Sequence, residues 1–309
     1  PERMASVHPL HPTESGSEIA ARALLLFNPR SRRAARSMPE LTRALERNGL
    51  ELEVARADRP DVLATLLAAH GRDIDRVLLA GGDGTIHNAL PDLIGQWRPV
   101  GLLPLGTAND FARSVGIPFE PEAACAVAAR GRPRRIDVGQ VNDIYYCNVA
   151  HIGLGVQVVQ SLSPTRKRLL GPLEYLRSIL DALRHRRAFS VSVLDDAGQR
   201  HQFKAVHVAI GNGRFYGAGS VVEASARIDD GQLDLYSIDA QPLGQLLRLG
   251  PSLRHGQAGN EHGVRRLGGR SLEIDTGVSL PIETDGEIRA HTPARFRVLP
   301  GALRVLAPG

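Results

Sequence analysis

The sequence has few cysteines and no long apolar run. Cys125 and Cys147 form no CxxC pair and cannot provide a disulfide framework, which suits a reducing cytosol, so we interpret both as core residues. No apolar run approaches the roughly 20 residues that a membrane-spanning helix needs. Residues 1–22 lack the apolar segment of a signal peptide and are expected to be a flexible leader. We therefore expect a cytoplasmic protein that binds at most to a membrane surface.

Lysine is nearly absent as well. Lys167 and Lys204 are the only lysines among the 38 basic residues, and the net charge is +5. An arginine-rich balance favours anionic partners such as nucleotides or phospholipid surfaces. The arginines are spread along the whole chain, without a helix-turn-helix pattern or aromatic residues between basic ones, so we expect no binding to nucleic acid.

The first part of the chain alternates short apolar runs with helical patterns. The apolar runs at 23–27, 50–55, 76–80 and 100–105 predict buried strands, and the patterns at 39–48 and 60–70 predict helices. Strands that alternate with helices are typical of a mostly parallel sheet with helices on its faces. We therefore expect an α/β domain over residues 23–137.

After about residue 136 the pattern changes to short alternating runs. They lie at 190–194, 206–210, 233–238, 271–274 and 294–298, and turn-forming residues separate them. This pattern is typical of an antiparallel sheet. We expect a β-rich, mainly antiparallel sandwich domain over residues 138–300, with one helix at 173–187. The apolar run at 302–306 suggests that the segment 301–309 returns to the first domain.

Residues 81–85, with the sequence GGDGT, follow one of the predicted strands and precede a helical pattern. Glycines let the backbone approach a ligand, and the N–H groups at a helix start face an anion, so this loop is a candidate phosphate site. An aspartate repels phosphate unless a cation intervenes, and Mg²⁺ is the usual mediator. Asp83 therefore predicts a metal–nucleotide complex. Thr85 or Asp83 is available as the helix N-cap, and a plain Asp-Gly turn is the alternative interpretation.

A second loop of the same kind follows the apolar run at 100–105. Gly106 and Thr107 come after this run, and Asn109 and Asp110 stand at the start of a helical pattern. Neighbouring parallel strands end at the same edge of a sheet, which is where open α/β folds bind ligands. We therefore expect Asp110 to lie near Asp83, although Asp110 could also be a helix cap.

A third stretch, PIETDGEIRA at 281–290, places acidic residues around one glycine. A tight Asp-Gly turn that presents Glu287 could carry a general base. On spacing alone, a hairpin turn with solvated acidic side chains is the simpler interpretation.

Together these loops resemble the diacylglycerol kinase catalytic-domain family, which includes sphingosine kinases. The segments 81–85, 103–118, 212–239 and 285–308 carry the resemblance, which runs from about residue 23 to 308 and is greatest to the bacterial YegS-like lipid kinases. GGDGT alone also occurs in NAD kinases and phosphofructokinases, so the combination with GTANDFA and the later DGE carries the resemblance. It implies an NAD-kinase-like α/β domain that holds ATP, a β-rich domain for the lipid, and a cleft between them.

The resemblance also implies roles for individual residues. FNPRS at 27–31 resembles the family's phosphate-contacting turn. Asp83 and Asp110 match carboxylates of the Mg²⁺-ATP network, and Glu287 matches the position proposed as the base. The nucleotide-binding residues that it implies are Asn28, Pro29, Ser31, Gly81, Gly82, Asp83, Gly84, Thr85 and Thr107.

The chain departs from the family pattern at two places. Arg32 and Arg33 follow Ser31 where the family has a glycine, and an arginine there could pair with phosphate. Asn88 stands where the family's loop has a glutamate, and an amide contributes no charge to a metal or ribose contact. Pro91 is expected to interrupt the helix that follows.

The segment ARIDDGQLD at 226–234 resembles a second, structural metal site of the bacterial branch. There Asp230 would ligate through its side chain, and Arg227 and Gln232 through backbone carbonyls, an oxygen set suited to Mg²⁺ or Ca²⁺. A hairpin turn is the alternative, because Asp-Gly is typical of one. His151 and His207 stand in apolar runs and are predicted to be core histidines rather than ligands.

We therefore expect an ATP- and Mg²⁺-dependent lipid kinase that phosphorylates a hydroxyl of diacylglycerol, phosphatidylglycerol or a related lipid. Basic residues between 166 and 187 would dock it at the inner face of the membrane, with a solvated basic face as the alternative. A soluble-substrate kinase of the NAD-kinase type and a non-catalytic lipid- or nucleotide-binding homologue are the other hypotheses. The identity of the lipid and the oligomeric state leave no signature in the sequence.

Overall fold

A computed structural model of the protein describes residues 21–309, except 30, 58, 60, 71, 155, 158–176, 178–180, 183, 186, 214, 217–219, 222–226, 243 and 246–262. The predicted leader, apart from residues 21 and 22, lies outside the described residues. The same is true of most of the predicted helix at 173–187 and of most of the basic stretch at 166–187.

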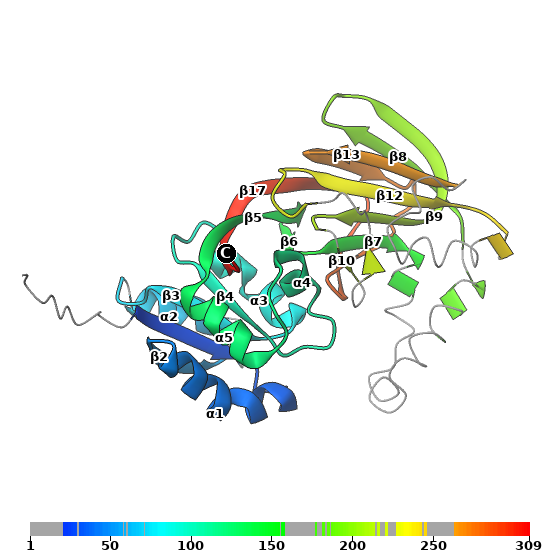
Figure 1. The fold of residues 1–309 in the computed structure, drawn as a ribbon. Helices are drawn as coiled ribbons and strands as arrows, with labels where there is room; N and C mark the ends of the chain where they lie inside the picture. Colours follow the sequence, from blue (N-terminus) through cyan, green and yellow to red (C-terminus); the bar gives the residue numbers. More distant parts are fainter. Residues whose placement is uncertain are drawn as a thin grey trace, which may run out of the picture.

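The first part of the chain forms a parallel sheet with helices around it (Figure 1). Its strands lie in the order β4-β3-β1-β2, and every neighbouring pair is parallel. Helix α1 packs against α5 and β2, and α3 packs against β3 and α2. The elements are β1 (Ala21–Phe27), α1 (Arg32–Arg47), β2 (Leu50–Arg56), α2 (Val62–His70), β3 (Arg76–Gly81), α3 (Asp83–Leu93), β4 (Val100–Pro104), α4 (Asp110–Val115) and α5 (Pro121–Arg130).

The second part consists mainly of antiparallel strands, which confirms the predicted fold class. Each of the five alternating runs lies within a strand: β8, β9, β12, β14 or β17. The elements are β5 (Arg132–Val141), β6 (Ile144–Tyr146), β7 (Val149–Gly153), β8 (Phe189–Asp195), β9 (Arg200–Gly211), β10 (Phe215–Tyr216), β11 (Ser220–Val221), β12 (Leu233–Asp239), β13 (Val264–Gly269), β14 (Ser271–Asp275), β15 (Pro281–Thr284), β16 (Glu287–His291) and β17 (Ala294–Ala307).

Strand β17 runs from one part of the fold to the other (Figure 1). It pairs antiparallel with β14 and β5, and its end pairs parallel with β4 at Val305 and Val100. The main sheet is therefore continuous, in the order β16-β15-β7-β9-β8-β14-β17-β4-β3-β1-β2. This order brings the start of the chain and its last strand into one sheet.

Buried apolar side chains form one core around the parallel strands and another between the antiparallel strands. Cys125 and Cys147 are both free and buried, which confirms their interpretation as core residues. Burial raises the pKa of the Cys125 thiol to about 11. His151 and His207 are also buried, as predicted.

Two predicted helix boundaries are wrong. Helix α1 begins at Arg32 rather than Pro39, because Ser31 Oγ accepts a hydrogen bond of 3.2 Å from the backbone N–H of Ala34 and caps the helix. Pro39 lies inside this helix. Helix α3 continues past Pro91 to Leu93, and the N–H of Ile94 still donates to the carbonyl of Leu90 at 3.0 Å, so Pro91 does not interrupt it.

Candidate active site

Three turns follow the neighbouring strands β1, β3 and β4 at one edge of the parallel sheet. They contain the predicted nucleotide residues at 28–31, 81–85 and 106–107. The second and third turns touch through their backbones: a Cβ atom added to Gly82 would lie 2.8 Å from the Cα atom of Gly106. Glycine is therefore required for this close approach, whatever ligand the turns bind.

The turn after β1 lies near the second glycine loop, because Arg33 contacts that loop. Ser31 N–H donates to the carbonyl of Asn28 at 3.1 Å, which closes the turn. The guanidinium Nη1 of Arg33, on the exposed first turn of α1, lies 3.5 Å from the carbonyl oxygen of Gly106. Arg33 thus places a cation beside the second glycine loop, at one of the two positions where the sequence departs from the family pattern.

Asp83 joins the two glycine loops. Its Oδ1 accepts a hydrogen bond of 3.0 Å from the N–H of Phe111, and its Oδ2 accepts one of 3.2 Å from the N–H of Asp110. The sequence suggested Asp83 or Thr85 as the N-cap of α3, and this prediction is wrong. The N-cap is Gly82, which has no side chain that could cap the helix. The Asp83 carboxylate accepts from N–H groups of α4 instead.

The third turn is also held by an amide side chain. Asn109 has φ 51°, and its Oδ1 accepts from the N–H of Gly106 at 2.8 Å, while its Nδ2 donates to the Gly106 carbonyl at 3.0 Å. Asp110, next in the chain, is buried. The sequence placed Asp110 near Asp83, and the structure joins them directly through the backbone N–H of Asp110.

Asp83 and Asp110 are the candidate side-chain ligands of a Mg²⁺ ion. Among the described residues, no three His, Cys, Asp or Glu side chains form a group that could hold a metal. Mg²⁺ is often held by only one or two carboxylates together with substrate phosphates and water. Each oxygen of Asp83 accepts one backbone hydrogen bond and keeps a further acceptor direction. The residues therefore fit a Mg²⁺ ion that arrives with a nucleotide.

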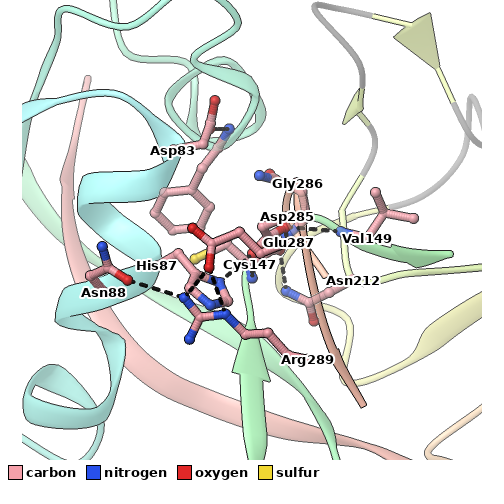
Figure 2. A network of polar contacts seen from close by, with 12 residues as sticks. Asp83, His87, Asn88, Cys147, Val149, Asn212, Asp285, Gly286, Glu287 and Arg289 are labelled. Atoms are coloured by element: carbon pink, nitrogen blue, oxygen red, sulfur yellow. Dashed lines mark hydrogen bonds and ion pairs between the residues drawn. The ribbon is translucent and has the colours of Figure 1, made fainter. Parts of the chain in front are cut away.

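The Asp-Gly turn between β15 and β16 forms a hairpin and comes from the other part of the fold. Asp285, at φ 46°, has a side chain that is 1% exposed. Its carboxylate accepts from the N–H groups of Cys147 at 2.7 Å, Asn148 at 3.0 Å and Val149 at 3.3 Å, and its Oδ2 lies 3.2 Å from His87 Nδ1 on α3 (Figure 2). Asp285 therefore anchors this turn to both parts of the molecule.

Cys147 lies close to both halves of the site (Figure 2). Burial, followed by the charges of Asp285 and Asp83, raises the pKa of its thiol well above the ordinary value. The helix that begins with Asp83 contacts the turn at 285–287 through His87 Nδ1, which lies 3.2 Å from Asp285 Oδ2 although the two residues are 198 positions apart in the sequence. Sequence reasoning missed His87 and Asp285 as partners because nothing local to either residue indicates this pairing.

Glu287 follows the turn and has an exposed side chain, whereas the Asp285 side chain is buried. Arg289 Nε and Nη2 lie 3.1 and 2.6 Å from Glu287 Oε2. The same Nη2 lies 3.3 Å from the side-chain oxygen of Asn88 on α3. Figure 2 shows these three side chains side by side, with Arg289 between the other two. Sequence reasoning considered Asn88 and Glu287 separately and overlooked Arg289.

A row of buried polar side chains starts beside this turn. Glu283 Oε1 accepts from the N–H of Gly286, and its Oε2 lies 3.9 Å from His151 Nε2. The His151 and His207 rings stack at 5.2 Å, and His207 Nε2 lies 3.4 Å from the Tyr236 hydroxyl. Burial, with a smaller effect of the Asp285 charge, raises the pKa of Glu283 to about 8, so this carboxyl group is largely protonated at neutral pH.

The candidate structural metal segment forms a turn. Asp230 is exposed, and its Oδ1 accepts from the N–H of Gln232 at 3.0 Å. The buried side chain of Asp137 stabilises the turn, because its Oδ2 accepts from the N–H of Gly231 at 2.6 Å. Arg227 contacts Asp229 through its side chain at 3.2 Å. These contacts are typical of the hairpin-turn alternative. They use Asp230 Oδ1, so Oδ2 is the oxygen that could ligate a cation.

Comparisons with known proteins agree on one family. Residues 22–141 match the diacylglycerol kinase catalytic domain, and residues 148–307 match the YegS C-terminal NAD kinase beta sandwich-like domain. A Chromohalobacter salexigens protein named "Probable lipid kinase YegS-like" is 36% identical over 76% of this chain and 76% of its own length. A Pseudomonas aeruginosa protein with the same name is 37% identical over 75% of this chain and 76% of its own.

A solved structure supports the fold. A crystal structure named as a diacylglycerol kinase from Bacillus anthracis has a TM-score of 0.74 and 20% identity, and the match covers 93% of this chain and 96% of that one. A Mycobacterium tuberculosis protein named diacylglycerol kinase is 28% identical over 85% of this chain and 87% of its own length.

Proposed function

This chain belongs to the diacylglycerol kinase catalytic-domain family, in its branch of YegS-like lipid kinases, and on that basis we propose that it transfers the γ-phosphate of ATP to a hydroxyl group of a membrane lipid. The family makes the chain a kinase. ATP as the donor and a lipid hydroxyl as the acceptor are the proposal. Diacylglycerol and phosphatidylglycerol are the acceptors to test first.

The observation that carries this proposal is the meeting of the two glycine loops with the turn at 285–287. Asp83 holds the loops together at the start of α3, and the same helix contacts the turn through His87 Nδ1, which lies 3.2 Å from Asp285 Oδ2. A nucleotide held by the loops would therefore have its phosphates close to the side chains of the second domain. Phosphoryl transfer depends mainly on such positioning and on charge neutralisation.

Glu287 is the proposed base. Its side chain is 63% exposed and can reach a substrate, whereas the Asp285 carboxylate is 1% exposed and is occupied by four donors. In the proposed step, Glu287 takes the proton of the lipid hydroxyl. The hydroxyl oxygen bonds to the γ-phosphorus, the bond from that phosphorus to the β-phosphate oxygen breaks, and ADP leaves.

Asp83 and Asp110 would hold Mg²⁺ with the nucleotide phosphates, and Mg²⁺ would neutralise charge that develops on them. The proposed nucleotide contacts are Asn28, Pro29, Ser31, Gly81, Gly82, Gly84, Thr85 and Thr107. Arg33 lies beside these loops and adds a cation that a phosphate can pair with. Each of these residues acts by binding or orienting the nucleotide.

Two further assignments belong to the proposal and rest on the family resemblance. One is a structural Mg²⁺ or Ca²⁺ at Asp230 with the carbonyls of Arg227 and Gln232, for which Asp230 offers one oxygen. The other is contact with the inner face of the membrane, where the lipid acceptor resides. The described residues include no helix that is both long and apolar enough to cross a bilayer.

The experiment is transfer of radiolabelled γ-phosphate from ATP to a total lipid extract, followed by defined diacylglycerol and phosphatidylglycerol in mixed micelles. NAD serves as a parallel acceptor. We expect label in lipid, none in NAD, and loss of transfer when EDTA removes divalent metal. Label in NAD with none in any lipid would support a soluble-substrate kinase and overturn the proposal.

The variant that tests the base is E287Q. We expect a fall in kcat of about 10²- to 10⁴-fold, which is the range for removal of a general base. The matched control is E273Q on β14, because Glu273 is another exposed glutamate that pairs with an arginine, Arg295, at 3.7 Å. E287Q with full lipid phosphorylation would show that the base is another group.

A further inference from the structure

Arg289 stands where the two parts of the fold meet beside the candidate base. Its backbone belongs to β16, in the antiparallel part, and its Nη2 reaches Asn88 on α3 at 3.3 Å. Asn88 and Arg289 are separated by 201 positions in the sequence. The guanidinium therefore connects the second domain to the helix that follows the first glycine loop.

The contact between Arg289 and Glu287 is selective for one oxygen. Both Nε, at 3.1 Å, and Nη2, at 2.6 Å, donate to Glu287 Oε2. Among the described residues, the hydrogen bonds and ion pairs of the Glu287 side chain all involve Oε2 and not Oε1. The arginine thus fixes the carboxylate from one side and leaves one oxygen available to accept a proton.

Asn88 holds Arg289 without competing for its charge. The amide oxygen accepts one hydrogen bond from Nη2 and is neutral, so the positive charge of Arg289 stays with Glu287. A carboxylate at position 88 would attract the guanidinium away from Glu287. Two other polar side chains of these segments, His87 on α3 and Asp285 before β16, lie 3.2 Å from each other and contact each other.

We propose that Arg289 and Asn88 are positioning residues: Asn88 anchors the Arg289 guanidinium to α3, and Arg289 holds Glu287 with its Oε1 directed to the lipid hydroxyl. This inference rests on the proposed role of Glu287 as the base. It gives Asn88, which departs from the family pattern, a defined partner in this chain. Neither residue contacts the reacting atoms, so each acts through Glu287.

The test is a double-mutant cycle of E287Q and R289A in the lipid-kinase assay. R289A alone is expected to lower kcat by roughly 10- to 100-fold, a typical cost of a misplaced catalytic group, with the KM for ATP changed by less than about 2-fold. In the E287Q background, R289A is expected to cause no further loss, because the residue acts through Glu287.

Two conservative variants separate geometry from charge. R289K keeps the positive charge but loses the planar fork, so it should recover only part of the kcat lost in R289A. N88D places a carboxylate beside the guanidinium and should lower kcat more than N88A does. The matched control is R295A, which removes an exposed arginine from an ion pair on β14 and β17 and should leave kcat unchanged.

Hydrogen exchange gives a readout that does not depend on any lipid. N88A and R289A should each raise amide exchange over 285–291 in the free protein, because each removes the Asn88–Arg289 contact of β16 with α3. Unchanged exchange in both variants would overturn the anchor, even if no lipid is phosphorylated by the wild-type protein.

The kinetic outcomes separate this inference from the proposed function. If E287Q is impaired and R289A multiplies that loss, the base stands and the positioning role is wrong. If R289A raises the KM for ATP by more than about 10-fold at unchanged kcat, the arginine binds nucleotide phosphate instead, which also overturns the inference. Full activity of E287Q would show that the base is another group, which overturns the positioning role but leaves the proposed phosphoryl transfer to a lipid standing.

Discussion

The carboxylate of Asp83 accepts a hydrogen bond of 3.0 Å from the backbone N–H of Phe111, which lies in the first turn of α4, after the second of two glycine loops. The other oxygen of the same carboxylate accepts from the N–H of Asp110 at 3.2 Å. The aspartate inside GGDGT therefore has a structural partner as well as a proposed role with Mg²⁺. Its charge is balanced in part by two N–H dipoles at the start of α4.

D83N tests this structural role. An asparagine can accept one of the two hydrogen bonds, but its amide N–H₂ then faces the second backbone N–H. We expect a loss of about 1–3 kcal/mol in the free energy of unfolding, the usual cost of an unsatisfied polar group. Urea denaturation measures this, with D275N as the control, because Asp275 accepts one exposed bond from Gly277 N–H at 2.8 Å. Equal stability of D83N and the wild type would contradict the structural role.

D285N tests the anchor of the Asp-Gly turn. Oδ1 of Asp285 accepts from the N–H groups of Asn148 and Val149, and Oδ2 accepts from the N–H of Cys147 and contacts the His87 ring, so an amide nitrogen in either orientation opposes at least one backbone N–H group. We expect about 1–3 kcal/mol of destabilisation for each buried N–H group that is left without an acceptor, together with lost activity. Calorimetry and the lipid-kinase assay measure the two effects. Lost activity at unchanged stability would instead make Asp285 a participant in the chemistry.

The buried carboxyl group of Glu283 should make the protein less stable as the pH rises. Burial raises its pKa from 4.5 to about 8, so between these values the folded state holds a proton that the unfolded state has released. The contribution of this group to stability is therefore complete below about pH 4.5 and falls until about pH 8, by about 5 kcal/mol at most. E283Q, which is neutral at every pH, should flatten this part of the stability profile. A profile of the same slope in E283Q would contradict the assignment.

His207 should produce the opposite slope at lower pH. Burial lowers its pKa from 6.5 to about 4, so between these values the unfolded state binds a proton that the folded state does not. The stabilising contribution is present above pH 6.5 and is lost as the pH falls towards 4, by about 3 kcal/mol at most. H207Q should reduce acid destabilisation in this window, as measured by urea denaturation at fixed pH values. Equal acid sensitivity in H207Q and the wild type would assign the effect to other groups.

Much of the local structure could be predicted from the sequence. The apolar runs at 76–80 and 100–105 became β3 and β4, and the glycines that follow them lie where each strand passes to the next helix, because strand pattern and glycine signals are local properties. The start of α1 was missed because Pro39 looked like the first helical residue. The residue that caps α1, Ser31, stands eight positions before Pro39 and is followed by two arginines.

The candidate site could be predicted only in part. The glycine loops and the DGE segment were recognisable, but the four donors around Asp285 come from α3 and from the start of β7. No periodicity links these segments, since they become neighbours only through the order β15-β7 in the sheet and the packing of α3 beside it.

The sequence by itself determined which residues form strands, helices and glycine turns, and which family motifs the chain carries, because these depend on neighbours along the chain. Only the tertiary structure decided that Asp83 would tie two loops together and that Arg289 would lie between Asn88 and Glu287. These contacts join segments up to 201 positions apart, and they exist because β17 closes one continuous sheet that brings both parts of the chain to the same place.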